Sequence, residues 1–338
     1  MIEVPDLDYR NALWFCKMLD KYKPKYENEK FIFDFSQVNN CDPFPMLMVS
    51  NAIRHKREQY GLNEFARRNC NNGYANHMKF YRACGIDMGE KVETTKGNSR
   101  YRCITKLTIK DLYSEGAENL DSIQETISKK AVEMANVLAM NNNKFGKWIA
   151  YMLREVLRNI PEHSKSETIW YCAQCWPNCD LVELSILDEG IGIMESLKDC
   201  YEYRETIDDD YTALLLALEP GVSGTFAGCR PSIGTGEWKN SGYGLYMVSQ
   251  MCAELGASFI IASGNSAIRV YKDRKSGEIV KEKYETYIRG TAIQIRIRPS
   301  QSVNYEEISA AILKRGEKLA KNKDNVFHSA SKSSRGFI

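Results

Sequence analysis

The sequence lacks long apolar runs, and no stretch approaches the about 20 residues that a membrane-spanning helix needs. Its first residues, MIEVPDLDYRNALWF, have neither the basic flank nor the apolar core of a secretory signal. An excess of one charge is also missing, because 46 basic and 44 acidic residues leave a formal net charge of +2. We therefore expect a cytoplasmic protein whose partners are neither a membrane nor a nucleic acid.

The 11 cysteines form no disulfide framework, because their number is odd and their positions are scattered. Cys172, Cys175 and Cys179 make the one cluster, and a zinc site there would need a fourth ligand. Cys172 and Cys175 lie at an odd separation in a predicted strand, which directs their side chains to opposite faces. We expect reduced cysteines that pack as small apolar side chains.

Two common nucleotide-binding signatures are absent as well. The sequence has no G-x-x-x-x-G-K-[ST] phosphate loop, and no G-x-G-x-x-G follows a predicted strand.

The chain is long enough, at 338 residues, for two domains with hydrophobic cores. Hydrophobic residues at 43% and charged residues at 27% are typical of a globular protein.

We predict four segments: an α/β domain at 1–100, a linker at 101–124, a second domain at 125–300, and a tail at 301–338. Within the first domain, residues 30–60 predict a strand, KFIFDFSQV, followed by a helix. The tail carries one amphipathic helix, EEISAAILKRGEKLA, and a Lys/Ser-rich end that we expect to be disordered.

The second domain begins with a helical region, from about 119 to 160, that is interrupted at Asn141-Asn142-Asn143. A predicted hairpin follows, with TIWYCAQCW and DLVELSILDEG on either side of a Pro177-Asn178 turn. Residues 194–241 are a polar insertion around one short helix, TALLLALE. A helix, GLYMVSQMCAELG, and the strands SFIIASG, AIRVYK and TAIQIRIRP complete the domain.

A first candidate motif lies on the second helix of this domain. Glu155 and Asn159 are four residues apart, so they share one face of that helix. An amide oxygen can ligate Mg²⁺, and a carboxylate can orient a water or hydroxyl nucleophile. A solvated polar face is the alternative interpretation. Pro161 argues against a helix that continues to His163, which would share the same face.

A second motif ends a strand in VELSILDEGIGI. Asp188 takes the last buried position, and Gly190 and Gly192 allow the backbone to turn sharply and to approach a ligand. A carboxylate in such a place can accept a hydrogen bond from an exocyclic amine, which favours adenine over guanine. A plain turn after the strand is the alternative.

A third motif precedes the helix in SGYGLYMVSQMCAELG. Gly242 and Gly244 place backbone N–H groups at a helix N-terminus, where anions such as phosphate bind. Lys239 and Asn240 lie just upstream and add candidate phosphate donors, with a mobile charged loop as the alternative.

Glu155-x-x-x-Asn159, DEGIGI, GYGL and the late dipeptide Gly290-Thr291 together resemble the motifs of the GHKL ATPases, over roughly residues 125–300. That superfamily includes gyrase, heat-shock chaperones, sensor histidine kinases and mismatch-repair ATPases. The resemblance implies the Bergerat fold, an α/β sandwich with a mixed sheet and helices on one face. The fold class expected for the whole chain is α+β.

The same resemblance assigns a role to each candidate residue. It implies that Asn159 holds Mg²⁺, that Asp188 binds the adenine amine, and that Thr291 touches the adenine region. The glycines Gly190 and Gly192 would shape the adenine pocket, and Gly242 and Gly244 would close the phosphate side. The insertion at 194–241, with GVSG at 221–224, would then be an ATP lid.

The N-terminal residues resemble a STAS-like domain through FIFDFSQV, the helix after it, and HMKFYRACGI. In anti-sigma antagonists of that family a serine after the strand accepts phosphate. The corresponding place here reads Cys41-Asp42-Pro43-Phe44-Pro45 and has no hydroxyl. This domain is therefore not expected to be a phosphoacceptor.

The motifs predict a Mg²⁺-dependent ATP-binding protein, a slow ATPase in which Glu155 orients water and ATP drives a conformational switch that controls a protein partner. One alternative is an anti-sigma-type serine kinase, because Glu155 could equally activate a hydroxyl. Another is a nucleotide-sensing interaction module without hydrolysis. Histidine autophosphorylation is not expected, since only His55 and His77 lie upstream and His55 has no acidic neighbour after it. Many relatives dimerise, so a homodimer remains an open alternative.

Overall fold

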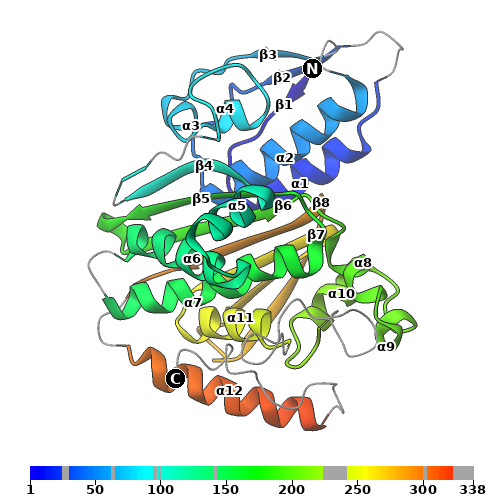
Figure 1. The fold of residues 1–338 in the computed structure, drawn as a ribbon. Helices are drawn as coiled ribbons and strands as arrows, with labels where there is room; N and C mark the ends of the chain where they lie inside the picture. The colour runs from blue at the N-terminus through cyan, green and yellow to red at the C-terminus, as the bar shows by residue number, and fades with distance from the viewer. Residues whose placement is uncertain are drawn as a thin grey trace.

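The chain folds into two β-sheets with helices packed between and around them (Figure 1). The computed structural model describes residues 1–24, 30–61, 65–93, 97–98, 100–139, 143–223, 242–299 and 303–322. The fold combines helices with β-sheets, as the expected α+β class does. Across these ranges, every helix is either too short or too polar to span a membrane.

The N-terminal part contains a small parallel sheet in the order β1-β2-β3. Its elements are β1 (Ile2–Glu3), α1 (Tyr9–Lys21), β2 (Phe31–Asp34), α2 (Pro43–Tyr60), β3 (Phe65–Arg68), α3 (Gly73–His77) and α4 (Phe80–Ala83). The predicted strand and helix of residues 30–60 are confirmed as β2 and α2. Phe31 of β2 stacks on Phe65 of β3 at 4.7 Å between ring centroids, which adds to the apolar contact between the two strands. The STAS resemblance stays a prediction.

The C-terminal part contains a five-stranded sheet in the order β4-β5-β6-β8-β7. Its strands are β4 (Tyr101–Thr108), β5 (Thr168–Trp176), β6 (Leu181–Asp188), β7 (Ser258–Lys272) and β8 (Ile279–Ile297). Every pairing in this sheet is antiparallel, so the expected mixed sheet is wrong. The reason is the connections: hairpins join β5 to β6 and β7 to β8, and a hairpin can join only antiparallel strands.

The main helices of this part are α5 (Ile109–Asn119), α6 (Ile123–Leu138), α7 (Asn143–Asn159) and α11 (Gly244–Glu254). Helices α6, α7 and α11 cover one face of the five-stranded sheet, and α1 and α2 cover the other (Figure 1). The main helices of the second domain thus lie on one face of its sheet, as expected, and the N-terminal part covers the other face. Both faces are apolar: Ile169 and Tyr171 of β5 point to one, and Trp170 points to the other. Such a sheet needs cover on both sides.

The predicted linker at 101–124 is also wrong for most of its length. Residues 101–108 form β4 at the edge of the large sheet, and α5 follows directly. Cys103 and Ile104 of β4 are buried in the core shared with the N-terminal part. A capping box starts α5, because the Thr108 side chain accepts from the Asp111 N–H and the Asp111 carboxylate accepts from the Thr108 N–H.

The predicted hairpin is confirmed, with β5 and β6 joined through a short 3₁₀ turn at Pro177–Cys179. The opposite orientation of the two strand cysteines is confirmed as well. Cys175 packs on the side of α6, α7 and α11, whereas Cys172 packs on the side of α1 and α2. Both thiols are free and buried, which agrees with packing as small apolar side chains.

The N-terminal part docks on the sheet through an ionic cluster at the start of α2, in which Glu183 is buried and Asp42 and Arg296 are partly exposed. Arg296 of β8 contacts Asp42 at 2.8 Å and Glu183 at 3.1 Å. The backbone N–H of Phe44 donates to Glu183 at 2.9 Å. Burial and the nearby Asp42 raise the pKa of Glu183 to about 7, although Arg296 partly opposes this. The segment that lacks the STAS hydroxyl is thus an interface between the two parts.

The insertion differs from the single short helix that the sequence predicts. Its described part contains α8 (Gly192–Lys198), α9 (Tyr201–Arg204) and α10 (Asp210–Ala217). The predicted phosphate donors Lys239 and Asn240 lie outside the described residues. SFIIASG and AIRVYK belong to one strand, β7, with a register shift near Ser263 and Gly264. The predicted tail helix is confirmed as α12 (Tyr305–Asn322), which packs against α11 and α7.

Candidate functional site

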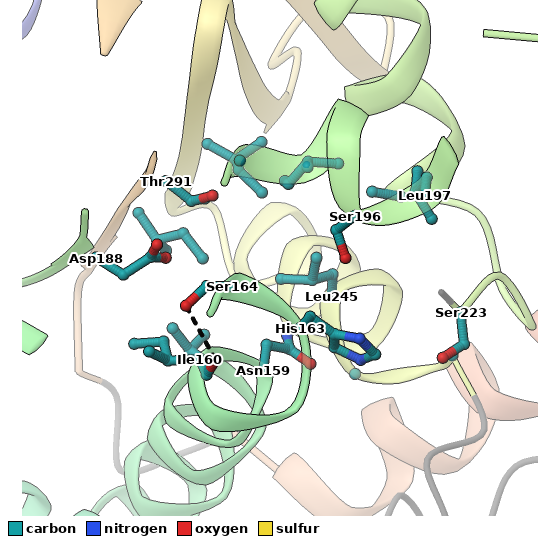
Figure 2. Close-up of a pocket in the computed structure, with 18 of the residues that line it drawn as sticks. Asn159, Ile160, His163, Ser164, Asp188, Ser196, Leu197, Ser223, Leu245 and Thr291 are labelled. Carbon is teal, nitrogen blue, oxygen red and sulfur yellow. Dashed lines mark hydrogen bonds between the residues drawn. The ribbon is translucent and has the colours of Figure 1, made fainter. Parts of the chain in front are cut away.

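The end of α7 carries the first motif and continues further than Pro161 suggests. A π-helical turn, Ile160–Ser164, follows Asn159 without a break. A π-turn widens the helix and is frequent at functional sites. As a result, Asn159 and His163 both line the same cavity (Figure 2). Within the turn, Ser164 donates from its hydroxyl to the carbonyl of Ile160 at 2.9 Å.

Asp188 ends β6 and lies directly opposite Thr291 of β8 in the antiparallel register. This pairing brings the second motif beside the late Gly-Thr dipeptide, although about a hundred residues separate them in sequence. The Asp188 side chain is only 5% exposed. It accepts a hydrogen bond from the backbone N–H of Gly190 at 2.9 Å.

Burial raises the pKa of the Asp188 carboxyl from 3.8 to about 7. The hydrogen bond from the Gly190 N–H and the contact with the Ser164 side chain favour the ionised form, but they do not cancel the loss of hydration. The charge of Glu189, the next residue, raises the pKa further. A buried carboxyl with a strongly shifted pKa in a cavity is a common feature of functional sites.

Two of the motif glycines are required by close backbone packing. A Cβ at Gly190 would lie 2.0 Å from the Ser164 carbonyl oxygen, which fixes the turn after β6 against the π-turn. A Cβ at Gly242 would lie 2.3 Å from the carbonyl oxygen of Val222, and Gly242 also has a φ of +70°. Both positions therefore exclude other residues for reasons of structure, whatever the ligand.

The three motifs converge on one cavity, which holds about 810 Å³ of space with its mouth included. The walls are largely apolar, as those of small-molecule pockets usually are. The polar side chains that line the cavity are Asn159, His163, Ser164, Asp188, Ser196, Ser223 and Thr291.

The structure brings together most of the residues predicted from the sequence. The ones that line the cavity are Asn159, Asp188, Gly192, Gly242, Gly244 and Thr291. Glu155 and Gly190 do not line it. Gly190 instead packs against the π-turn, and Glu155 lies one helical turn before Asn159.

Glu155 lies on α7, where its side chain is buried against the start of α11 and forms an ion pair. Its carboxylate contacts the guanidinium of Arg154 at 3.0 Å. A Cβ on Gly244 would lie 2.8 Å from Glu155 Oε2, so the carboxylate sits against the first residue of α11. Glu155 therefore lies next to the Gly242-x-Gly244 motif but faces Arg154 rather than the open cavity.

Some cavity residues are missed by the motifs. His163 lies four residues after Asn159 and lines the cavity, although Pro161 predicts that the helix ends before it. The sequence indicates Ser164 more clearly, because a small polar residue fits a turn that the backbone of Gly190 approaches closely. Ser196 and Ser223 come from the insertion, where no periodic pattern identifies the residues that point inward.

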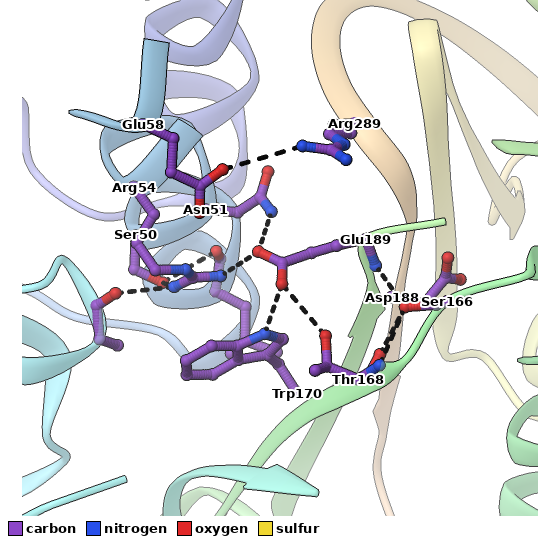
Figure 3. A network of polar contacts seen from close by, with 12 residues as sticks. Ser50, Asn51, Arg54, Glu58, Ser166, Thr168, Trp170, Asp188, Glu189 and Arg289 are labelled. Carbon is purple, nitrogen blue, oxygen red and sulfur yellow. Dashed lines mark hydrogen bonds and ion pairs between the residues drawn. The ribbon is translucent and has the colours of Figure 1, made fainter. Parts of the chain in front are cut away.

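Glu189, next to Asp188, faces the opposite side of the sheet and joins the N-terminal part (Figure 3). Its carboxylate accepts hydrogen bonds from Arg54 at 2.8 Å and from Asn51 at 3.0 Å, both on α2. It also accepts from the indole N–H of Trp170 at 3.0 Å and from the hydroxyl of Thr168 at 3.1 Å. Although burial alone would raise it, these contacts hold the pKa of Glu189 below its usual value.

No protein-family model matches the chain, and no match was found among curated proteins. Its function is therefore inferred from the cavity and from the motifs that form it.

Proposed function

We propose that the cavity binds ATP with Mg²⁺ and that the protein is a slow, GHKL-type ATPase that acts as a conformational switch. The observation that carries this proposal is the convergence of three motifs on one cavity. They come from the end of α7, the end of β6 and the start of α11. Their order along the chain is the one that the resemblance implies.

The adenine base would occupy the part of the cavity beside Asp188 and Thr291. Asp188 offers an acceptor oxygen at the bottom of a largely apolar pocket, where water competes poorly for the exocyclic amine. Guanine carries a carbonyl at the equivalent position, and its oxygen would face the carboxylate. The pocket should therefore bind ATP in preference to GTP.

The phosphates would lie toward the start of α11, which is 11 residues long. Its first N–H groups have no partner within the helix and carry partial positive charge, so they favour an anion. Gly242 and Gly244 line the cavity here without side chains that would block the approach. Asn159 lies on the same cavity and would supply an oxygen ligand to Mg²⁺.

Hydrolysis would require Glu155 to orient a water molecule near the phosphates. Its position against Gly244 supports this role, because that residue begins the helix proposed to bind phosphate. The contact with Arg154 favours a second candidate function, a nucleotide-sensing module without turnover. In that case Glu155 would remain paired with Arg154 after ATP binds.

The test is calorimetric titration of the full chain with ATP and with GTP, each with and without Mg²⁺. We expect micromolar, Mg²⁺-dependent binding of ATP that is lost in Asp188→Asn. The matched control is Asp208→Asn, the same chemical change at an exposed position outside the cavity. Folded wild-type protein that binds no ATP would contradict the proposal, and binding without phosphate release would select the sensing module.

A further inference from the structure

A second cleft opens on the other side of the sheet, between α2, α4, β4 and β5. It is lined by Arg54, Arg82, Lys91, Val92, Glu93, Lys106 and Trp170, which we call the basic cleft. Its open volume is about 950 Å³ with its wide mouth included. Four of the seven lining side chains are basic and one is acidic, so a ligand in the cleft would meet mainly positive charge.

Trp170 forms the floor of the basic cleft and positions two of the cations. The Arg54 guanidinium stacks over the indole ring at 3.8 Å from its centroid (Figure 3). The Lys106 ammonium lies 5.5 Å from the same ring. Cation–π contacts of this kind hold the cations in place while leaving their N–H groups available.

Arg54 is held in one orientation by further contacts. It donates to the carbonyl of Ala83 at 2.7 Å and to Glu189 at 2.8 Å. A weaker contact reaches the Ser50 hydroxyl at 3.5 Å. A guanidinium has five N–H donors, so these contacts leave donors for a ligand. Such an ordered guanidinium is well suited to a planar or tetrahedral oxyanion.

Lys106 differs from the two arginines of the cleft. Arg54 pairs with Glu189, and Arg82 pairs with Asp87. Within the described part of the chain, Lys106 lies within ion-pair distance of no carboxylate. An anion in the cleft would therefore interact with the full positive charge of Lys106, whereas at the two arginines it would compete with the carboxylates that already contact them.

We propose that the basic cleft binds a phosphate group, with Lys106 and Arg54 as its principal ligands. A phosphate monoester carries close to two negative charges at neutral pH and offers three acceptor oxygens. Those features match a cluster of cations better than the single charge of a carboxylate. This site is separate from the nucleotide cavity and would exist even if that cavity did not bind ATP.

The test uses the full chain labelled with 5-fluorotryptophan and followed by ¹⁹F NMR. The protein has five tryptophans, so the Trp170 signal can be assigned from its loss in Trp170→Phe. We expect inorganic phosphate to shift the Trp170 signal in a saturable manner, and sodium chloride of equal ionic strength to leave it unchanged. Lys106→Gln should weaken the phosphate affinity about tenfold, since one charge-assisted contact is lost.

The matched control is Lys110→Gln, an exposed lysine on α5 outside the cleft, which should leave the affinity unchanged. A Trp170 signal that does not move, or an equal affinity in Lys106→Gln and wild type, would overturn the proposal. A phosphoserine peptide and its unphosphorylated form then identify the source of the phosphate. If the phosphopeptide binds more tightly than inorganic phosphate, the source is a phosphorylated protein, and if the two bind equally, it is free phosphate. Equal binding of the phosphorylated and the unphosphorylated peptide would refute phosphate recognition.

Discussion

Replacing Asp188 by asparagine should stabilise the protein while it removes the proposed adenine contact. Asp188 is 5% exposed, and its pKa rises from 3.8 to about 7. A rise of that size corresponds to about 4 kcal/mol of unfavourable free energy for an ionised Asp188 above pH 7. Asparagine has nearly the same shape and carries no charge, so the variant avoids this cost.

The gain is smaller than 4 kcal/mol because an amide loses part of the hydrogen bonding. The carboxylate accepts from the Gly190 N–H, and the Thr291 N–H and the Ser164 side chain also bond to it. One amide oxygen cannot satisfy all of these donors, and leaving one unpaired costs about 1–2 kcal/mol. A net gain of about 2–3 kcal/mol should remain at pH 8, which raises Tm by roughly 3 °C for a chain of this length.

The sign of the pH dependence follows from the raised pKa. Below about pH 4 the carboxyl is protonated in both the folded and the unfolded protein, so it adds no difference in stability. Between about pH 4 and pH 7 only the unfolded chain ionises freely, and wild-type stability falls as the pH rises. The advantage of Asp188→Asn should therefore be near zero at pH 5 and full at pH 8.

The prediction is tested by measuring the Tm of wild type and of Asp188→Asn from pH 5 to pH 8. Glu183, which also has a pKa of about 7, is present in both proteins, so its contribution cancels in the difference. Asp208→Asn serves as the exposed control and should show no such trend. A variant that melts at or below the wild-type temperature at pH 8 would refute the reasoning, as would a gain independent of pH.

The remaining predictions concern the nucleotide and the domain boundary. Asn159→Ala should abolish Mg²⁺-dependent ATP binding in calorimetry, whereas Glu155→Ala should spare binding and stop phosphate release; equal loss of binding in both would contradict the role given to Glu155. A fragment of residues 101–338 should aggregate in size-exclusion chromatography, because removing α1 and α2 exposes buried residues such as Trp170 and Ile260. A soluble, monomeric fragment would show that the large sheet does not need the N-terminal part.

The elements with strong periodicity could be predicted from the sequence. The β5–β6 hairpin shows alternating apolar residues around a proline turn, and α12 shows an amphipathic pattern, so local chemistry determines both. The cavity residues could be predicted because each motif places polar side chains or glycines at the end or the start of a helix or strand. Asp188 and Gly242 are examples.

The packing of the second sheet face could not be predicted. Trp170 and Cys172 alternate with Ile169 and Tyr171, which shows that both faces are apolar but not what covers each. That cover depends on contacts between residues more than a hundred positions apart, such as Phe44 with Glu183. The π-turn could not be predicted for a related reason. Pro161 disfavours an α-helix, but the wider turn accommodates it.

Two consecutive acids at the end of β6 connect the two candidate sites. Asp188 faces the nucleotide cavity, and Glu189 faces Arg54 in the basic cleft. Because the charge of Glu189 raises the pKa of Asp188, Glu189→Gln should lower that pKa. Arg54→Gln should raise it, since Glu189 would lose the cation that offsets its charge.

The two variants therefore predict opposite shifts, which can be measured without any nucleotide. In each background, the pH dependence of the Tm difference between the protein and its Asp188→Asn derivative reports the pKa of Asp188. Shifts in the same direction would show that the contact between Arg54 and Glu189 does not act on Asp188. Opposite shifts would mean that the ion pair between Arg54 and Glu189 on one side of the sheet affects the charge of Asp188 on the other.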